Sequence, residues 1–208
     1  MNPGEKHAGK LFVFSGPSGA GKGTICKRLL EEVDELAVSV SMTTRAPRNG
    51  EVDGISYYFT EKEAFEEHIA QGRLLEYAEV YGNYYGTPKE PVIEKLQAGI
   101  DVILEIDMQG ALKVKENYPD GVFVFILPPS MSILRKRLTG RGTETQEAIE
   151  LRLGETLKEL SYIEKYDYCV VNGELEEAVA RAKAIIMAEH SKVAFTAEEL
   201  IASYKEEE

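Results

Sequence analysis

The feature that most constrains this chain is an apolar run that breaks into a glycine-rich turn and resumes as a helix. Residues 11–30 read LFVFSGPSGAGKGTICKRLL. A strand, a tight turn and a helix in this order form the setting of a phosphate-binding loop. Gly16, Gly19 and Gly21 let the backbone amides approach an anion, and the N-terminus of the following helix favours its negative charge. The sequence therefore predicts a nucleotide phosphate site here.

The loop prediction covers a continuous set of residues. Its members are Gly16, Pro17, Ser18, Gly19, Ala20, Gly21, Lys22, Gly23 and Thr24. Lys22 would reach the β- and γ-phosphates of ATP. The alternative is a glycine-rich turn with an ordinary surface lysine. At an average glycine usage of about 7%, however, three glycines at set positions arise only about once in 3,000 starts.

Gly23 departs from the usual pattern, in which a Ser or Thr follows the lysine. The hydroxyl that would bind Mg²⁺ directly is therefore absent at this position. We expect no direct protein ligand to the metal, because Mg²⁺ keeps much of its water shell and can be held by nucleotide phosphates and water. This variant of the loop favours small-molecule kinases over switch GTPases.

Net charge limits the classes of partner. The chain has 36 acidic and 24 basic residues among 208, and this excess argues against non-specific binding to nucleic acid or anionic membranes. The N-terminus lacks an apolar signal core, and no apolar run approaches the ~20 residues of a membrane span. Cys26 and Cys169 both lie in apolar contexts and are expected to be buried free thiols. We expect a cytoplasmic protein.

Short runs rich in β-branched and aromatic residues alternate with helical patterns. The expected strands are Leu11–Phe14, Ala37–Val40, Val102–Ile106, Val122–Leu127 and Tyr168–Val171. The expected helices are Gly21–Val33, Lys89–Gln97, Gly110–Asn117, Met131–Leu138, Gln146–Tyr166, Leu175–His190 and Ala197–Tyr204. Several strands are continuously apolar, which favours an α/β fold with a five-stranded parallel sheet covered by helices on both faces.

The rhythm changes between the second and third strands. The expected elements there are two antiparallel strands, Ser56–Thr60 and Leu74–Tyr81, and a helix between them, Glu61–Gln71. Thr60 and Glu63 would form a capping box at the start of that helix. Residues 41–88 are therefore expected to form a small lobe inserted in the α/β core. The polar, glycine-containing stretch 139–147 is expected to be a mobile loop between two helices.

A second anion site is predicted where residues 39–59 read SVSMTTRAPRNGEVDGISYYF. Arg45 and Arg48 lie three residues apart, and two guanidinium groups can clamp one phosphate with paired hydrogen bonds. Tyr57 can add a hydroxyl donor. Taken alone, a solvated pair of charges explains the two arginines equally well.

Residues 74–88, LLEYAEVYGNYYGTP, predict the wall of a polar, aromatic pocket. A buried Glu76 carboxylate suits guanine, because N1–H and N2–H₂ of that base are adjacent donors, whereas adenine presents an acceptor at N1. An unpaired buried carboxylate costs about 1–3 kcal/mol or more, so it discriminates between the bases. Ser41 and Thr87 could supply hydroxyls to O6 and its neighbours. The tyrosines of this stretch, Tyr85 among them, would otherwise simply pack.

Two acidic residues occur at the end of the third expected strand. Glu105 and Asp107 are two residues apart, so both would project from one face of the strand. Asp107 lies at the carboxyl end, where open α/β sheets bind ligands. We expect Asp107 to bind Mg²⁺ through water or to contact the nucleoside. The alternative is a structural cap of the turn at Gln109 and Gly110.

Several further motifs occur in a fixed order behind GPSGAGKGT. They are SVSMTTRAPRNGEVDG, GNYYGTP, ILEIDMQG, LPPSMSILRKRLTGRGTET and VVN. Together they resemble the guanylate kinases of the bacterial type over residues 9–190. The resemblance implies the P-loop kinase fold and transfer of the ATP γ-phosphate to GMP or dGMP, giving ADP and GDP or dGDP, with Mg²⁺ as cofactor.

The resemblance also assigns roles residue by residue. The GMP phosphate would be held by Arg45, Arg48, Tyr57 and Tyr85, and the guanine would be read by Ser41, Glu76 and Thr87. The transferring group would be neutralised from a closing lid by Arg137, Arg141 and Arg152. Lys22, Arg45 and Asp107 complete the implied catalytic set. Asn172 resembles a residue near the adenine of ATP, although an N-cap of the helix at Glu174 explains it almost as well.

The implied organisation has several segments. They are an N-terminal tail (1–8), a core (9–40, 89–138 and 153–190), a GMP-binding lobe (41–88), a lid (139–152) and a C-terminal helical extension (191–208). Two other functions remain open. Guanylate-kinase-like domains of scaffolding proteins bind partners without catalysis, but they typically lack an intact ATP loop. A related kinase could act on another phosphorylated acceptor, such as a ribose bisphosphate, although Glu76 argues for a purine. A homo-oligomer is compatible with the sequence.

Overall fold

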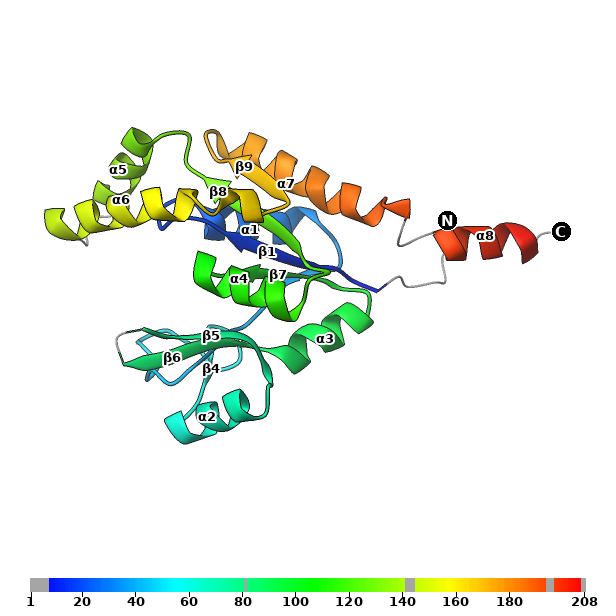
Figure 1. Ribbon diagram of the computed structural model, residues 1–208, viewed down its shortest axis with the longest axis horizontal. Coiled ribbons are helices and arrows are strands. Elements are labelled where there is room, and N and C mark those ends of the chain that lie inside the picture. The colour runs from blue at the N-terminus through cyan, green and yellow to red at the C-terminus, as the bar shows by residue number, and fades with distance from the viewer. Residues whose placement is uncertain (1–7, 81, 141–144, 194–196, 207–208) are drawn as a thin grey trace.

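The computed structural model describes residues 8–80, 82–140, 145–193 and 197–206. A five-stranded sheet in the order β2-β7-β1-β8-β9 forms its centre, and every neighbouring pair of strands is parallel (Figure 1). The strands are β1 (Leu11–Ser15), β2 (Leu36–Val38), β7 (Asp101–Glu105), β8 (Val122–Leu127) and β9 (Tyr168–Val171). The predicted α/β fold with a five-stranded parallel sheet is confirmed.

Helices cover both faces of this main sheet. One face carries α1 (Lys22–Glu32) and α7 (Leu175–His190), and the other carries α3 (Lys89–Gln97) and α4 (Met108–Asn117) (Figure 1). Side chains along a strand alternate between faces, so Phe12 packs with the first pair of helices and Val13 with the second. Burying each such side chain contributes about 1.5–3 kcal/mol. The packing fixes the carboxyl ends of β1 and β7, where the candidate site lies.

A second, smaller sheet has the strand order β4-β3-β6-β5. Its elements are β3 (Met42–Thr43), β4 (Tyr58–Phe59), β5 (Leu74–Val80) and β6 (Asn83–Pro88), with α2 (Lys62–Ala70) between β4 and β5. β5 and β6 form an antiparallel hairpin, and β6 also pairs antiparallel with β3. We name these four strands the small sheet. The strands β3 and β6 were not predicted.

Two predictions for this segment are wrong. β4 pairs parallel with β3 rather than antiparallel, because residues 44–57 form a connection long enough to bring the chain back in the same direction. Thr60 does not cap α2, since Glu61 is the N-cap residue and no side chain caps that end. Thr60 instead donates its amide to Thr43 O at 3.0 Å and so still belongs to the edge of the small sheet.

A helical hairpin leaves the main sheet after β8. It consists of α5 (Met131–Thr139) and α6 (Gln146–Leu160), which pack through Leu134, Leu138, Ile149 and Leu153. α6 ends six residues before the predicted Tyr166. A turn and a short 3₁₀ helix, η1 (Ile163–Lys165), follow, and they bring the Tyr166 ring edge-on against Phe125, with 4.8 Å between ring centroids. Residues 141–144 lie outside the described residues.

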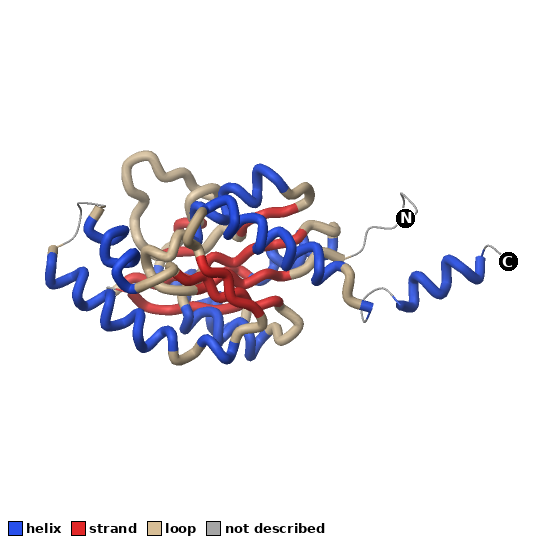
Figure 2. The backbone as a smooth tube through the Cα atoms, turned by 90° about the horizontal axis from the view of Figure 1, so that it is seen from above, coloured by secondary structure: helices blue, strands red, loops and turns tan. Residues whose placement is uncertain are grey.

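The two cysteines and the last helix complete the description. Cys26 is buried as predicted, but Cys169 is exposed, and both are free thiols. β9 is an edge strand, and its buried residue Val170 faces α7, so Cys169 points to the opposite, uncovered side. The helix α8 (Ala197–Glu206) lies beyond α7, away from the main sheet (Figure 2).

Candidate active site

The phosphate-binding loop joins β1 to α1 and has the backbone conformation that its glycines predict. Gly16 and Gly21 have φ values of +140° and +91°, which residues with a Cβ rarely adopt. A Cβ at Gly16 would lie 2.1 Å from Ile126 O, and one at Gly21 would lie 2.3 Å from Asn172 Nδ2. The loop is therefore pressed against its neighbours from two sides, and only glycine fits at these positions.

Several carbonyl groups of the loop are held by side-chain donors. Lys22 Nζ donates to Gly16 O at 2.6 Å and to Pro17 O at 3.3 Å. Ala20 O accepts from Asn172 Nδ2 at 2.8 Å. At the other side of the loop, the first amides of α1 have no partner within the helix, as at every helix start. The arrangement offers amide donors and an ammonium group to an anion.

Burial lowers the pKa of the Lys22 ammonium, and the nearby Glu105 carboxylate partly opposes that shift. Glu105 also lies close to Gly23, since a Cβ at Gly23 would be 3.3 Å from Glu105 Oε2. A carboxylate thus stands beside the position where related loops carry the metal-binding hydroxyl. Within the described residues, no three His, Cys, Asp or Glu side chains are grouped to bind a metal directly. A Mg²⁺ ion held by nucleotide phosphates and water would fit beside the Glu105 carboxylate.

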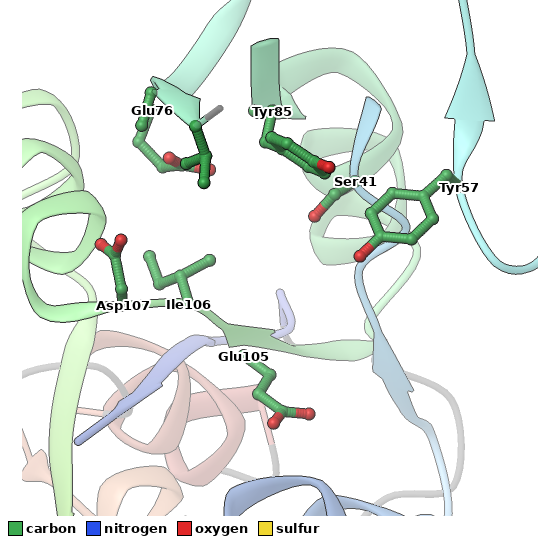
Figure 3. A pocket seen from close by; sticks show the side chains of 10 residues that line it. Ser41, Tyr57, Glu76, Tyr85, Glu105, Ile106 and Asp107 are labelled. Atoms are coloured by element: carbon green, nitrogen blue, oxygen red, sulfur yellow. The ribbon is translucent and has the colours of Figure 1, made fainter. Parts of the chain in front are cut away.

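A cavity of about 260 Å³ separates the main sheet from the small sheet. Its lining residues are Ser41, Tyr57, Glu76, Ala78, Val80, Tyr85, Gly86, Glu105, Ile106 and Asp107. Figure 3 shows side chains from the small sheet facing the end of β7 across this cavity. Five of the predicted acceptor-site residues therefore line one pocket, although the sequence separates them by up to 66 positions, from 41 to 107.

Glu76 is the buried acid of this pocket. It is 8% exposed, and its Oε1 accepts a hydrogen bond from Thr87 Oγ1 at 2.8 Å. Burial raises the pKa of the Glu76 carboxyl, and the charge of Asp107 adds to that increase. The Thr87 hydroxyl thus serves Glu76 directly, and Thr87 is not among the residues that line the cavity.

Asp107 caps the helix α4. Its Oδ1 accepts from Gly110 N at 2.7 Å, so the structural alternative is confirmed, and Asp107 lines the cavity as well. The prediction that Glu105 and Asp107 share one face is wrong. β7 ends at Glu105, and Figure 3 shows Asp107 directed toward the small sheet and Glu105 directed away from it.

Gly110 lies between two of the acids that line the pocket, Glu76 and Asp107. A Cβ at this position would be 3.1 Å from Glu76 Oε2 and 3.3 Å from Asp107 Oδ1. The first turn of α4 therefore makes room for both carboxylates. The sequence contained this glycine in the motif MQG, but its spatial role required the contact between α4 and β5 to be known.

Arg45 is paired within the chain. Its Nη2 donates to both carboxylate oxygens of Glu51 at 2.8 and 3.0 Å, and its guanidinium lies 5.5 Å from the Tyr57 ring centroid. Glu51 also accepts from the Arg48 amide at 2.7 Å, and these contacts, that with Arg45 first, lower the pKa of Glu51. The Arg48 side chain is exposed. Sequence reasoning missed Glu51, although the pair Asn49–Gly50 before it indicates a turn, which Glu51 closes by donating its amide to Arg48 O at 3.1 Å.

Two of the predicted lid arginines contact the phosphate-binding loop. Arg137 donates to Asn172 O at 2.9 Å and to Ala20 O at 3.4 Å. Arg152, on α6, donates to Ser18 Oγ. Arg141 lies outside the described residues. The N-cap alternative for Asn172 is wrong, because Glu174 holds that position and no side chain caps α7.

Comparison with known proteins identifies the family. A family profile described as Guanylate kinase matches residues 8–189. The chain belongs to the guanylate kinase family. A guanylate kinase of Clostridium perfringens (strain SM101 / Type A) is 55% identical over 203 residues, which cover 98% of this chain and 94% of the relative. One of Clostridium acetobutylicum is 57% identical over 185 residues, covering 89% and 88%.

A solved structure agrees. The crystal structure of guanylate kinase from Anaplasma phagocytophilum has a TM-score of 0.74 and 37% identity, and the match covers 95% of this chain and 96% of that one. The predicted resemblance and the P-loop kinase fold are thus confirmed, and as a guanylate kinase family member the chain is an enzyme. Among the described residues, no helix is long and apolar enough to cross a membrane.

Proposed function

We propose that the chain transfers the γ-phosphoryl group of ATP to the phosphate of GMP or dGMP, giving ADP and GDP or dGDP. The observation that carries this assignment to guanine is Glu76, a buried carboxylate that lines a cavity next to the phosphate-binding loop. Burial raises the pKa of this carboxyl, and the hydrogen bond from Thr87 only partly opposes that increase. The paired N–H donors of guanine would supply further hydrogen bonds, whereas adenine would not.

The donor nucleotide is assigned to the loop between β1 and α1. The amides of residues 16–24 would surround the β- and γ-phosphates, and Lys22 would leave its carbonyl partners to follow the γ-phosphoryl group. Asn172, next to Ala20, is assigned to the same nucleotide site. Since the loop is fixed before any ligand binds, little ordering is required when the phosphates enter.

The acceptor is assigned to the cavity. Arg45, Arg48, Tyr57 and Tyr85 would hold the GMP phosphate, and Ser41, Glu76 and Thr87 would select the guanine, with Thr87 acting through Glu76. Asp107 would contact the nucleoside. An oxygen of the already anionic GMP phosphate would attack the γ-phosphorus, and the bond to the β,γ-bridging oxygen of ATP would break, so no general base is required.

Charge neutralisation would provide most of the rate enhancement, as in other phosphoryl transfers. Lys22, Arg45, Arg137, Arg141 and Arg152 are the cations assigned to this task. Mg²⁺, when bound with ATP, would neutralise charge on the phosphates, and Asp107, rather than Glu105, would contact its water shell. Residues 41–88 are assigned as the GMP-binding lobe and 139–152 as the lid, within a kinase domain of residues 9–190 that is flanked by tail segments 1–8 and 191–208.

A cytoplasmic setting and small-molecule substrates complete the proposal. A formal net charge of −12 disfavours a nucleic-acid or anionic-membrane partner. The proposal is compatible with either a monomer or a homo-oligomer.

A coupled ADP-release assay tests the proposed function. The purified chain would be supplied with ATP, Mg²⁺ and each nucleoside monophosphate in turn. GMP and dGMP should support turnover at least a hundredfold better than AMP, CMP or UMP. ADP release that is equal for AMP and GMP, or absent with GMP, would refute the assignment.

A further inference from the structure

Two side chains donate to the same main-chain carbonyl of the phosphate-binding loop, that of Ala20. Ala20 O accepts from Asn172 Nδ2 at 2.8 Å and, at 3.4 Å, from Arg137 Nη1. A carbonyl oxygen has two lone pairs, so these two donors fill its capacity. Arg137 belongs to α5 and Asn172 follows β9. Three segments that are distant in sequence therefore meet at a single carbonyl.

Both main-chain polar groups of Asn172, its N–H and its C=O, are hydrogen-bonded. Its amide donates to Leu127 O at 2.7 Å, at the end of β8, and its carbonyl accepts from Arg137 Nη2 at 2.9 Å. The residue is only 5% exposed. With the backbone anchored to the sheet and the side chain buried, Nδ2 is a rigid donor aimed at the loop.

The geometry of the peptide group determines what this contact does. A trans peptide is planar, and its C=O and N–H bonds point in opposite directions. When Asn172 holds Ala20 O, it therefore directs the N–H of Gly21 away from itself. Asn172 also occupies the space beside Gly21, because a Cβ there would lie 2.3 Å from Nδ2. The peptide between Ala20 and Gly21 has no freedom to flip while this contact exists.

We propose that Asn172 is a positioning residue for phosphoryl transfer, which aims the Gly21 N–H at the donor phosphates by holding Ala20 O, and that it does not select the adenine base. The inference deepens the proposed function and rests on it for the identity of the donor. Arg137 joins the same contact from the helical hairpin, so the hairpin and the loop share one anchoring point.

The test separates a contact with phosphate-binding amides from a contact with a base. Asn172→Ala removes Nδ2 and leaves the backbone contacts in place. Inorganic tripolyphosphate, which has no base, should bind about tenfold more weakly to the variant by calorimetry, the loss expected for one hydrogen bond. The ratio of kcat/KM for ATP to that for GTP as phosphate donor should stay as in the unaltered chain.

Two outcomes would overturn the proposal. One is a fall in the ATP-to-GTP ratio with unchanged tripolyphosphate affinity, which would make Asn172 a base-reading residue. The other is no change in either quantity. Since tripolyphosphate binding needs no acceptor, this measurement remains valid even if the unaltered chain fails to phosphorylate GMP, and the two failures are distinguishable.

Two further variants control for folding and for the type of bond. Asn172→Leu has a similar size and no charge but lacks the hydrogen-bond donor, so it should weaken tripolyphosphate binding by about the same factor. If Asn172→Ala does not fold, Asn172→Leu is used in its place. Tripolyphosphate affinity of that variant equal to that of the unaltered chain would overturn the proposal. Asn117→Ala removes a similar bond, from Asn117 Nδ2 to Leu75 O at 3.1 Å, and should leave tripolyphosphate binding unchanged.

Discussion

The two halves of the site are built by different means. The donor half is main chain: a loop between β1 and α1 whose glycines have positive φ and whose carbonyls are held by Lys22 and Asn172. The acceptor half is built of side chains from the small sheet and from the segment between β3 and β4, and several of those side chains already have partners, as in the pairs Arg45–Glu51 and Glu76–Thr87.

Because of this difference, different substitutions should impair the two halves. Binding by main-chain amides depends on backbone dihedral angles, so the donor half should tolerate most side-chain changes other than those at Lys22 and Asn172, but no Cβ at Gly16 or Gly21. Binding by side chains depends on the charge and hydrogen-bonding pattern of each group. The acceptor half should therefore lose specificity when a single carboxylate becomes an amide, even where its shape is kept.

The largest expected effect concerns Lys22, the lysine of the donor half. Lys22→Met should lower kcat about a thousandfold, because the charge that follows the γ-phosphoryl group is removed. Steady-state kinetics would measure the loss, and circular dichroism would check that the fold is kept. Lys27→Met, at an exposed position of α1, is the matched control. Near-normal turnover of Lys22→Met would remove the lysine from the mechanism.

A second change tests whether the acceptor half reads the base by charge. Glu76→Gln should reduce the preference for GMP over AMP about a hundredfold, because an amide can no longer accept two adjacent N–H donors. The ratio of kcat/KM values for the two acceptors would measure the effect. Glu79→Gln, an exposed position on the same strand, should leave the ratio unchanged. An unaltered preference in Glu76→Gln would assign base recognition to other residues.

A third change tests whether the two halves are energetically separate. Arg45→Ala should raise KM for GMP about tenfold, the cost of losing hydrogen bonds from a partly exposed charged group, with little change in KM for ATP. It also removes the guanidinium partner of Glu51, so Arg45→Ala/Glu51→Gln should recover part of any lost stability but not the KM. Arg73→Ala is the matched control on an exposed residue. An equal rise in both KM values would mean that the halves are coupled or wrongly assigned.

The smallest expected effect is on stability. Burial raises the folded-state pKa of Glu76 above its unfolded value of 4.5, so the folded chain binds more protons and loses stability as pH rises through that window. Glu76→Gln carries no such charge. Its free energy of unfolding should exceed that of the unaltered chain by about 1 kcal/mol at pH 7, and the difference should shrink at pH 4. Urea unfolding at the two pH values measures it, and a constant difference would contradict the linkage.

Local signals explain what the sequence could predict. The phosphate-binding loop lies within nine residues of chain, so its glycines and Lys22 reveal it directly. The five parallel strands follow from continuous apolar runs, and alternation along β1 explains why Phe12 and Val13 belong to different faces. Glu76 could be assigned because a carboxylate in an apolar, aromatic strand is expected to be buried, and a buried carboxylate needs hydrogen-bond donors such as those of guanine.

Long-range contacts explain what the sequence could not predict. Asn172 donates to Ala20 across 152 positions; the family resemblance assigns both residues to the ATP site, but no local pattern predicts this hydrogen bond. The parallel pairing of β3 and β4 depends on the path of residues 44–57, which carry no periodic pattern. Asp107 and Glu105 were expected to share a face because the strand was predicted to extend to Ile106, and its end at Glu105 reverses that conclusion.

The glycine at the start of α4 has a consequence for how acceptor preference can change. Because Gly110 has no side chain, the carboxylates of Glu76 and Asp107 can both lie next to it. A substitution that enlarges this residue would move both acids at once, whereas one at Glu76 alone would leave an opening shaped for the original base. Changing the base preference of such an enzyme would therefore require substitutions at the start of a helix and on a strand together. A variant with only one of these substitutions would be poorly active.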